Sequence, residues 1–454
     1  MTMFYLMLMR LYLWLLHLPL VSEVVFQVLG VPVAAKLFLG LGGDQVMVRV
    51  AGRRTLVTSS FVVSRRIFKE NGFNYTSRMA EDCGLERIGM LNQGIIWNNQ
   101  TREWKRLRQY FQQSVNSRSL ELAIKHTYDA VDQVMEVFPV FQQGGGSLDL
   151  LAFLRTVTLE VTNRLMFAVT LGDRADLISA IVGYFQAWEY FLIRPRLTYL
   201  LSPLTYTRHL AAVARLRAWS HSILQMKLSE LEELGEDSVP DNFLKQLVVD
   251  MRAGLVSEAG VVQCVLEMLI AGTDTSSVSL FYTLVCLAES DDWEEAVAEE
   301  VARVECSEET DPAIPVTEAC LKEAMRIKPV GPVVIRRALA ADPELDLMAG
   351  DNVIISLEHM HNCEERFPAP STFDPSRFLA GGTGEAEFLP FGAGPKSCVG
   401  RFLAMREMKA VMVRLLRGWK VELVGEGQGI GSLRVRWDIA QQPVDTILVT
   451  ISPR

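Results

Sequence analysis

The stretch that decides the fold is FLPFGAGPKSCVGR, from Phe388 to Arg401. It holds one cysteine, Cys398, with three glycines and two prolines, and no second metal-ligand side chain stands beside that thiol. The chain has 7 cysteines, an odd number, and none forms a CxxC pair, so zinc ribbons and disulfide scaffolds fit poorly. A nucleophilic thiol would need a base, but the nearest histidines, His359 and His361, match no recognisable dyad pattern.

The remaining chemistry for a lone thiol in such a loop is ligation of a haem iron as a thiolate. Ligation needs a loop whose backbone approaches the porphyrin closely, and Gly392, Gly394 and Gly400 permit that path because glycine tolerates positive φ. The sequence after Cys398 reads as a helix, so a helix N-terminus lies near the sulfur and favours its charge. The alternative for a single cysteine is a small buried hydrophobe, which is what we expect of most of the other six.

The composition indicates a large globular chain with an ample core. Its 454 residues are 49% hydrophobic, and the net charge of −9 argues against a nucleic-acid partner, which needs a basic surface. The unpaired cysteines indicate reduced thiols and a cytosol-facing domain. The patterns predict a hairpin over 45–60, helices over 120–137, 148–167, 175–192, 208–234 and 257–289, and further strands after residue 336 and over 438–451. We expect a mainly α class with small β-sheets.

The first 41 residues form a hydrophobic segment that we interpret as a membrane anchor. Among the first 43 residues only Arg10, Glu23 and Lys36 are charged. No uncharged run reaches the ~18 residues of a clean spanning helix, and Pro19 interrupts the segment. A removable signal peptide is the alternative, but it would have an early basic region and a small-residue cleavage site. We therefore expect an uncleaved anchor over 1–41 and one catalytic domain over 42–454.

Three motifs, in this order, resemble those of the cytochrome P-450 monooxygenases. Glu323-Ala-Met-Arg326 fits ExxR with both charged side chains on one helix face. Pro375-Ser-Arg377-Phe378 resembles the element that supplies the third member of that ion network, and FGAGPKSCVG fits the cysteine loop. The resemblance implies the cytochrome P-450 fold, haem b with Cys398 as axial ligand, dioxygen as substrate and electrons from NADPH–cytochrome P-450 reductase. The alternative for each of the two charged motifs, taken alone, is an ordinary surface ion pair.

The helix over 257–289 is the candidate oxygen-activating element. Its polar residues Gln263, Glu267, Asp274 and Thr275 fall at steps of three or four with Ala271, on one face of an otherwise apolar helix. A buried carboxylate is costly unless it has a role or partners. The resemblance implies that Asp274 and Thr275 hold dioxygen and relay protons, with Glu267 and Ala271 beside them. The alternative is a helix whose hydroxyls only bond back to its own carbonyls.

The resemblance also implies a set of residues around the haem. The expected partners of the haem propionates are cationic or N–H donors, with Lys396 standing where relatives often carry arginine and so losing the bidentate fork. The expected haem-binding residues besides Cys398 are Arg78, Trp104, Arg108, Arg336, Lys396, Phe391, Gly394 and Gly400.

Several segments further resemble the aromatase branch of the family, which converts androgens to oestrogens by three oxidations. They include LERIGMLNQGIIWNN over 85–99 and VLEMLIAGTDT over 265–275. The resemblance implies a membrane-bound enzyme of the endoplasmic reticulum, in contact with membrane lipid, with a flat apolar steroid pocket. The implied pocket residues are Ile96, Trp97, Phe185, Trp188, Ala271, Thr275, Val330, Val334, Ile335 and Ile439.

Three departures from the aromatase pattern keep other functions open. Thr273 replaces a proline, and Pro332 and Ala440 replace an aspartate and a serine near the steroid. The sequence therefore leaves two alternatives: a steroid or lipid hydroxylase of the same family that does not aromatise the A ring, and a haem-binding sensor or carrier without turnover. For a plain carrier, the Asp274-Thr275 pair would have no use.

Overall fold

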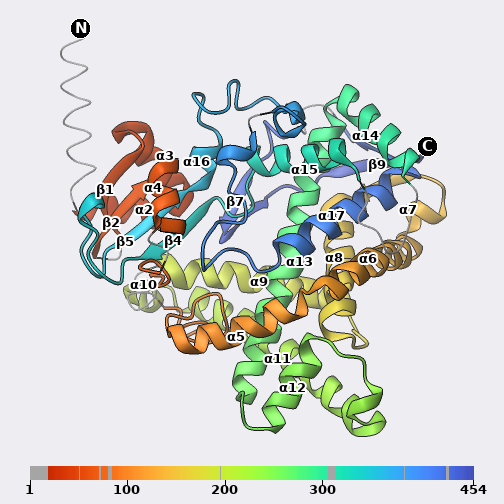
Figure 1. Ribbon diagram of the computed structural model, residues 1–454, viewed down its shortest axis with the longest axis horizontal. Coiled ribbons are helices and arrows are strands. Elements are labelled where there is room, and N and C mark those ends of the chain that lie inside the picture. Colours follow the sequence, from red (N-terminus) through yellow and green to blue (C-terminus); the bar gives the residue numbers. More distant parts are fainter. Residues whose placement is uncertain are drawn as a thin grey trace.

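The computed structural model describes residues 19–50, 52–70, 73–79, 84–194, 196–304, 313–382, 384–425 and 429–454. Helices make up most of the molecule, and the four-stranded sheet lies at one side with the long helices extending away from it (Figure 1). The expected class, mainly α with small sheets, is confirmed.

The longer helices of the described part form the body of the domain. They are α5 Thr101–Ser114, α6 Ser117–Val137, α8 Leu150–Thr162, α9 Arg174–Ile193, α11 Pro203–Leu234, α12 Phe243–Arg252, α13 Glu258–Ala288, α14 Asp291–Arg303, α15 Pro315–Ile327 and α17 Arg401–Leu416. The shorter ones are α2 Pro19–Leu29, α3 Val31–Gly42, α4 Phe61–Arg65, α7 Pro139–Gln142, α10 Arg196–Leu201 and α16 Leu357–His361. Single turns of 3₁₀ or π type lie at Arg66–Glu70, Asn163–Phe167, Glu236–Ser238, Pro343–Leu345, Pro375–Phe378 and Gly384–Glu387.

Three small sheets complete the fold. The first has the order β1-β2-β5-β4, the second β3-β9-β6 and the third is the β7-β8 pair. The predicted hairpin is β1 paired with β2, antiparallel, from Gln45 opposite Thr58 to Val50 opposite Arg53. The strands are β1 Gln45–Val50, β2 Arg53–Thr58, β3 Gly146–Asp149, β4 Val333–Arg337, β5 Asn352–Ser356, β6 Trp419–Leu423, β7 Val435–Asp438, β8 Ala440–Pro443 and β9 Leu448–Pro453.

Helix α13 passes through the middle of the molecule (Figure 1). It begins after Ser257, whose hydroxyl accepts a hydrogen bond from the Gly260 N–H, as an N-cap should. Of the described helices it is the one long and apolar enough to cross a bilayer, but the protein buries most of it. It is therefore the core helix of the domain, and its apolar length is explained by packing against α8, α11 and α15.

The described part of the N-terminal segment packs onto the first sheet. Helices α2 and α3 lie inside the range expected to be an anchor, yet Ala34, Ala35 and Phe38 are buried, and Phe38 stacks on Phe26 with ring centres 5.5 Å apart. Both helices contact β1. The packed domain thus begins before residue 42, because these apolar side chains serve the core. The rest of the expected anchor, residues 1–18, lies outside the described residues.

Candidate active site

The cysteine loop is shaped by its own backbone. The Cys398 N–H donates to the Phe391 carbonyl at 2.9 Å, which closes a tight turn beneath the thiol. Gly392 and Gly394 have φ of 63° and 70°, and a Cβ at Gly394 would come within 1.7 Å of the Phe68 carbonyl oxygen. Only glycine fits there. Gly400, by contrast, has a φ of −89°, so the expected positive φ is found at two of the three glycines.

The surroundings of Cys398 pull its pKa in both directions. Burial raises the thiol pKa, while the backbone N–H of Gly400 and the charges of Arg108 and Arg401 lower it. The Gly400 N–H directed at the sulfur is the kind of donor that tunes a metal-bound thiolate. The side chain is accessible although protein encloses it, because it opens into an internal cavity.

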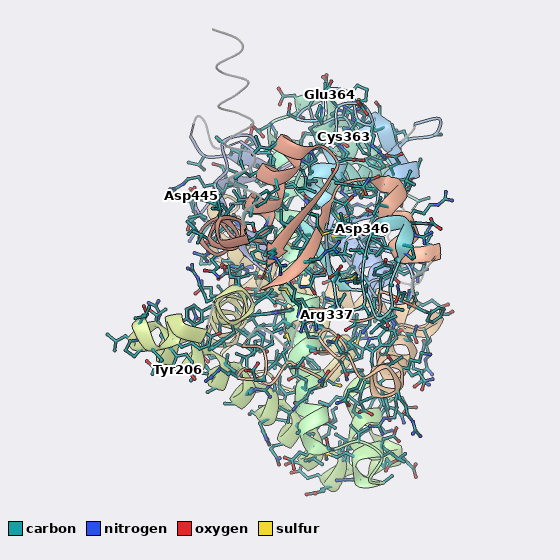
Figure 2. All side chains as sticks on the ribbon, turned by 90° about the vertical axis from the view of Figure 1, so that its left-hand side faces the viewer. Tyr206, Arg337, Asp346, Cys363, Glu364 and Asp445 are labelled. Carbon is teal, nitrogen blue, oxygen red and sulfur yellow. The ribbon has the colours of Figure 1, made fainter. Side chains whose placement is uncertain are left out.

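That cavity has a volume of about 440 Å³ and extends from Cys398 to the face of α13. Among the described cysteines Cys398 alone lines it. Cys264, Cys286 and Cys320 are buried in the core, and Cys363 lies at the far edge of the molecule (Figure 2). The predicted residues that line the cavity are Ile96, Trp97, Trp188, Glu267, Ala271, Thr275, Val330, Val334, Ile335, Ile439 and Phe391, together with Gly400 and the cations described below.

Phe185 is not one of the lining residues. Its ring stacks on Trp188 at 6.0 Å and 15°, and Trp188 in turn meets Trp97 edge-on at 5.7 Å. Residues three apart on a helix lie on nearly the same face, so the sequence could not separate the wall from its support. Phe185 therefore backs the wall of the cavity.

Three cations that line the cavity have no acidic partner. Arg78, Arg336 and Lys396 make no ion pair with any carboxylate in the described part of the chain. Arg336 donates to the Ile335 carbonyl and Lys396 to the Asn98 carbonyl. Burial, with mutual repulsion, lowers the pKa of Lys396 to about 6 and of Arg336 well below its usual range. Buried cations without counter-ions are costly, so this cluster fits a ligand that brings two carboxylates.

Trp104 and Arg108, expected to contact the same ligand, stand behind the lining. The Lys396 ammonium lies 3.8 Å from the centre of the Trp104 ring, and Arg108 donates to the Ser397 carbonyl at 2.8 Å. The Trp104 Nε1 is buried and lacks a partner within the described residues. Both side chains therefore support the cysteine loop through Lys396 and Ser397. The Trp104 N–H, which has no partner among the described residues, is one further donor for an acidic ligand.

Glu267 ties α13 to the loop over residues 84–100. Its carboxylate accepts from the Ile95 N–H at 2.6 Å and from the Ile96 N–H at 3.2 Å, and Gln263 donates to it as well. A Cβ at Gly94 would lie 2.3 Å from the carboxylate, so glycine is needed for this approach. Burial raises the Glu267 pKa to about 7. The expected catalytic carboxylate is thus occupied in holding the wall that carries Ile95 and Ile96.

Asp274 points away from the cavity. Its carboxylate forms an ion pair with Arg155 of α8 at 2.9 Å and a hydrogen bond with Gln442 of β8. Thr275, the next residue, lines the cavity and donates to the Ala271 carbonyl at 2.7 Å. The expected stripe therefore divides: Ala271 and Thr275 face the cavity, whereas Asp274 faces Arg155 and Gln442 of other elements.

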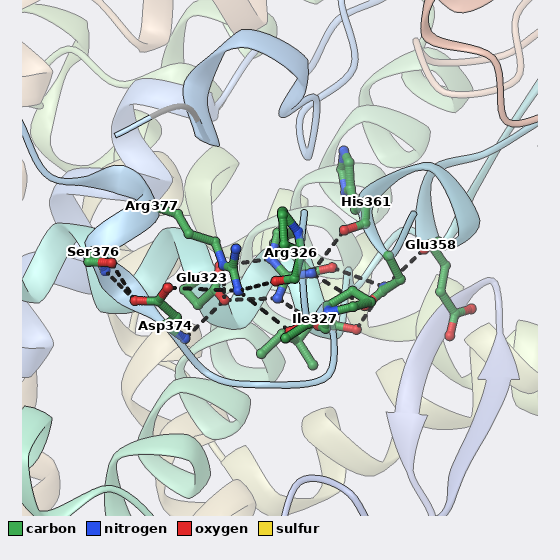
Figure 3. Close-up of polar contacts among 12 residues, drawn as sticks. Glu323, Arg326, Ile327, Glu358, His361, Asp374, Ser376 and Arg377 are labelled. Atoms are coloured by element: carbon green, nitrogen blue, oxygen red, sulfur yellow. Dashed lines mark hydrogen bonds and ion pairs between the residues drawn. The ribbon is translucent and has the colours of Figure 1, made fainter. Parts of the chain in front are cut away.

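The ion network predicted from the two motifs forms beneath the loop. Glu323 receives two hydrogen bonds from Arg326, both at 2.8 Å, and one from Arg377 at 3.3 Å (Figure 3). Arg326 also donates to the His361 and Pro370 carbonyls. Both Glu323 and Arg326 are fully buried, so the network clamps α15 to the segment that leads into the cysteine loop.

Several residues of the site were missed in the sequence. Arg155 and Gln442, the partners of Asp274, come from α8 and β8, and Glu407 of α17 lines the cavity with Ser276 as its hydrogen-bond partner. Burial raises the Glu407 pKa to about 8. The polar residues of α8 at positions 155, 158 and 162 form a stripe that could have signalled a buried partner. No local pattern pointed to Gln442.

The model of the cytochrome P-450 family matches residues 36–447. The chain belongs to the cytochrome P-450 family. This P-450 is a haem-thiolate monooxygenase, and its cofactor is haem held by a cysteine thiolate. It uses dioxygen and electrons from a redox partner. The residues fit that group, because an accessible thiol and three cations without a carboxylate partner in the described part of the chain line a single cavity.

Curated relatives of this P-450 include aromatases. It is 31% identical to the aromatase of Taeniopygia guttata over 440 residues, 94% of this chain and 84% of that one. It is 31% identical to the aromatase of Homo sapiens over 436 residues, 94% and 85%. Its homologues are thus related to steroid metabolism.

Solved structures share the fold at lower identity. A zebra fish cytochrome P-450 determined with abiraterone matches with a TM-score of 0.76 at 23% identity, covering 92% of this chain and 98% of that one. A cyanobacterial cytochrome P-450 with retinoic acid matches with a TM-score of 0.77 at 20% identity, covering 92% and 94%. The expected P-450 fold is confirmed.

Proposed function

We propose that this P-450 oxidises steroids and that its activity is that of an aromatase. The observation that carries the proposal is the similarity to aromatases over 94% of the chain. The cavity supports it, because Trp97, Trp188, Val334 and Ile439 offer a largely apolar wall that suits a rigid hydrocarbon skeleton. Haem, when bound, supplies the activation of dioxygen and the transfer of one of its atoms to the substrate.

The chain's own residues would perform four tasks. Cys398 would ligate the iron, while Arg78, Arg336 and Lys396 would bind the propionates and regain their full charge. Thr275 presents its hydroxyl on the cavity side of α13, where it would hold and donate a proton to oxygen. Asp274, held by Arg155 on the α8 side of the helix, would take up protons there and pass them toward that position.

The stoichiometry of the oxidation determines how many protons these residues must deliver. Each oxidation of a C–H bond by dioxygen consumes one NADPH and one proton beyond it, and releases one water. Two protons are therefore needed in each cycle to form that water. In an aromatase three such cycles act on the C19 region, and the last cleaves C19 and aromatises the A ring. Electrons would come from NADPH–cytochrome P-450 reductase, on a membrane of the endoplasmic reticulum with the catalytic domain facing the cytosol.

A second candidate is a steroid or lipid hydroxylase that does not aromatise. It is favoured by the orientation of Asp274, which in this structure cannot donate a hydrogen bond to a ketone in the cavity. Pro332 and Ala440 further remove two polar groups of the aromatase pattern. The non-catalytic sensor or carrier is not retained, because the family is that of monooxygenases.

One experiment separates the two candidates. The haem-loaded protein is incubated with reductase, NADPH and androstenedione, and the products are identified by mass. An aromatised product supports the aromatase proposal. Hydroxylated androgen that accumulates without aromatised product supports the hydroxylase instead, and no steroid product with full NADPH-dependent oxidation of fatty acids would refute the steroid proposal.

Asp274→Asn tests the proton supply. The variant keeps the shape but cannot exchange a proton, so steroid oxidation should fall by about 10²-fold or more. Arg155→Lys keeps the charge and should lose much less. Equal product formation by Asp274→Asn and the parent would remove Asp274 from the mechanism.

A further inference from the structure

The middle of α13 meets a polar stripe on α8. The two helices pack against each other in the body of the domain (Figure 1). Arg155, Thr158 and Thr162 stand on one face of α8, opposite Gly272 to Asp274 of α13. A Cβ at Gly272 would come within 2.6 Å of the Thr162 hydroxyl, so glycine is what allows the two backbones to approach here.

Thr158 makes the central contact of this stripe. Its hydroxyl donates to the Thr273 carbonyl at 2.7 Å, and both residues are buried. The carbonyls of its own helix, at Leu154 and Arg155, are farther, at 3.1 and 3.3 Å. A hydroxyl has one proton, so the shortest contact identifies the Thr273 carbonyl as the main acceptor.

The bond reaches the backbone directly before the Asp274-Thr275 pair. In a regular helix the Thr273 carbonyl accepts a hydrogen bond from the N–H four residues later. The Thr158 hydroxyl is a second donor to the same carbonyl oxygen, which has two lone pairs. Asp274 is held by Arg155 from the same face of α8. Two consecutive residues of α13 are thereby fixed to α8, which prevents α13 from rotating about its axis at this point. The rotation of the helix decides whether Thr275 faces the cavity, since each residue turns it by about 100°.

The contact with α8 is made at Thr273, where the aromatase pattern has a proline. A proline at position 273 would lack an N–H and would break the ladder of α13. Here the residue is threonine, and α13 is an unbroken helix from Glu258 to Ala288. The Thr273 hydroxyl is itself buried and has no partner within the described residues, so it is the carbonyl and not the side chain that connects to α8.

We propose that Thr158 is a positioning residue for oxygen activation: its hydroxyl, through the Thr273 carbonyl, holds Thr275 at the cavity. The proposal rests on the proposed role of Thr275. Loss of the hydroxyl would let α13 turn slightly, so protons would reach the oxygen less reliably and reducing equivalents would leave as hydrogen peroxide.

The test compares Thr158→Val, which removes the hydroxyl at nearly equal volume, with Thr158→Ser, which keeps it. The matched control is Thr156→Val on the same helix, because the Thr156 hydroxyl donates to the Ala152 carbonyl of α8 itself rather than to α13. All variants are loaded with haem and supplied with reductase, NADPH and androstenedione. Steroid product and hydrogen peroxide are measured per NADPH consumed, and hydrogen exchange is followed in the peptide over residues 270–280.

For Thr158→Val we expect product per NADPH to fall about 3- to 10-fold, as the loss of one buried hydrogen bond gives. Peroxide should rise to match, and the α13 peptide should exchange faster. Thr158→Ser should restore the coupling, and Thr156→Val should resemble the parent. Parental coupling and exchange in Thr158→Val, or an equal loss in Thr156→Val, would overturn the proposal. Thr158→Ala replaces the valine variant if that fails to fold.

Thr275→Ala separates this inference from the proposed function. If Thr275→Ala raises peroxide and Thr158→Val does not, the positioning role of Thr158 is wrong and the role of Thr275 stands. If Thr275→Ala leaves the coupling unchanged, the proposed role of Thr275 fails, and the positioning role fails with it. Faster exchange of the α13 peptide in Thr158→Val would then show only that the bond fixes the helix.

Discussion

The two sides of the cavity were built by different means. On the cysteine side, the turn is closed by a hydrogen bond between Cys398 and Phe391, seven residues apart, and by glycines that adopt φ values of 63° and 70°. On the α13 side, the two buried carboxylates are held by distant segments: Glu267 by the N–H groups of residues 95–96, and Asp274 by Arg155 and Gln442.

This difference explains which residue roles could be predicted. The local sequence predicts the geometry of a loop that is held by its own backbone, because the required glycines and the hydrogen-bonding residues lie close together in the chain. A polar side chain on a core helix carries no record of its partner, since that partner is brought by packing. Four predictions test this comparison, from the largest expected effect to the smallest.

Thiolate ligation of the haem should depend wholly on the Cys398 sulfur. Cys398→Ala should abolish the red-shifted Soret band that the reduced CO complex of a thiolate haem shows, because no other described cysteine lines the cavity. Cys363→Ala, a partly exposed cysteine outside the cavity, is the control and should keep the band. A normal thiolate spectrum in Cys398→Ala would place the ligand elsewhere.

The ion network below the loop should matter far more than a surface pair on the same helix. Glu323→Gln leaves the fully buried Arg326 without its carboxylate, and we expect a loss of about 3–5 kcal/mol in stability, with poor haem retention. Glu318→Gln, which breaks a partly exposed pair with Lys322, should cost at most about 1 kcal/mol. Chemical unfolding of both variants measures the ratio, and similar losses would argue against the clamp.

Glu267 should make the stability depend on pH. Burial raises its folded pKa to about 7 from 4.5, so between these values the folded state keeps a proton that the unfolded state releases. The contribution of this group therefore falls as pH rises from about 4.5 to 7, by up to about 3 kcal/mol. Comparing the unfolding midpoints of the parent and Glu267→Gln from pH 5 to 8 cancels the other groups.

The parent should lose stability relative to Glu267→Gln across that window. Glu233→Gln, an exposed carboxylate on α11, is the control and should follow the parent. A difference between parent and Glu267→Gln that stays constant with pH would mean that the carboxyl is already ionised at pH 5, held by the loop amides.

Trp188, which lines the cavity, should contribute more to substrate binding than Phe185, which packs behind it. Trp188→Leu removes a side chain that lines the cavity and should weaken steroid binding by about 10-fold, whereas Phe185→Leu behind it should change binding by less than about 3-fold. Titration of the spin-state change with androstenedione measures both. A larger effect of Phe185→Leu would return this residue to the cavity wall.

The α13 stripe shows how far reasoning from the sequence reached. The spacing of Ala271, Asp274 and Thr275 pointed to one segment of α13, and in the structure Ala271 and Thr275 of that segment line the cavity. Asp274 was expected on the same face, but a one-residue step turns a helix by about 100°, enough to point it at α8. The periodicity located the segment, but it could not show which of two adjacent residues, Asp274 or Thr275, faces the cavity.

The sequence by itself determined the haem-thiolate loop, the ExxR network and the core helix, because each depends on residues a few positions apart and on apolar periodicity. Only the tertiary structure decided which of those side chains face the cavity. It paired Asp274 with Arg155, set Phe185 behind Trp188, gathered Arg78, Arg336 and Lys396 without a counter-ion, and brought Thr158 to the Thr273 carbonyl. Apart from Phe185 and Trp188, which are neighbours on one helix, these contacts join residues tens to hundreds of positions apart, and packing chooses them.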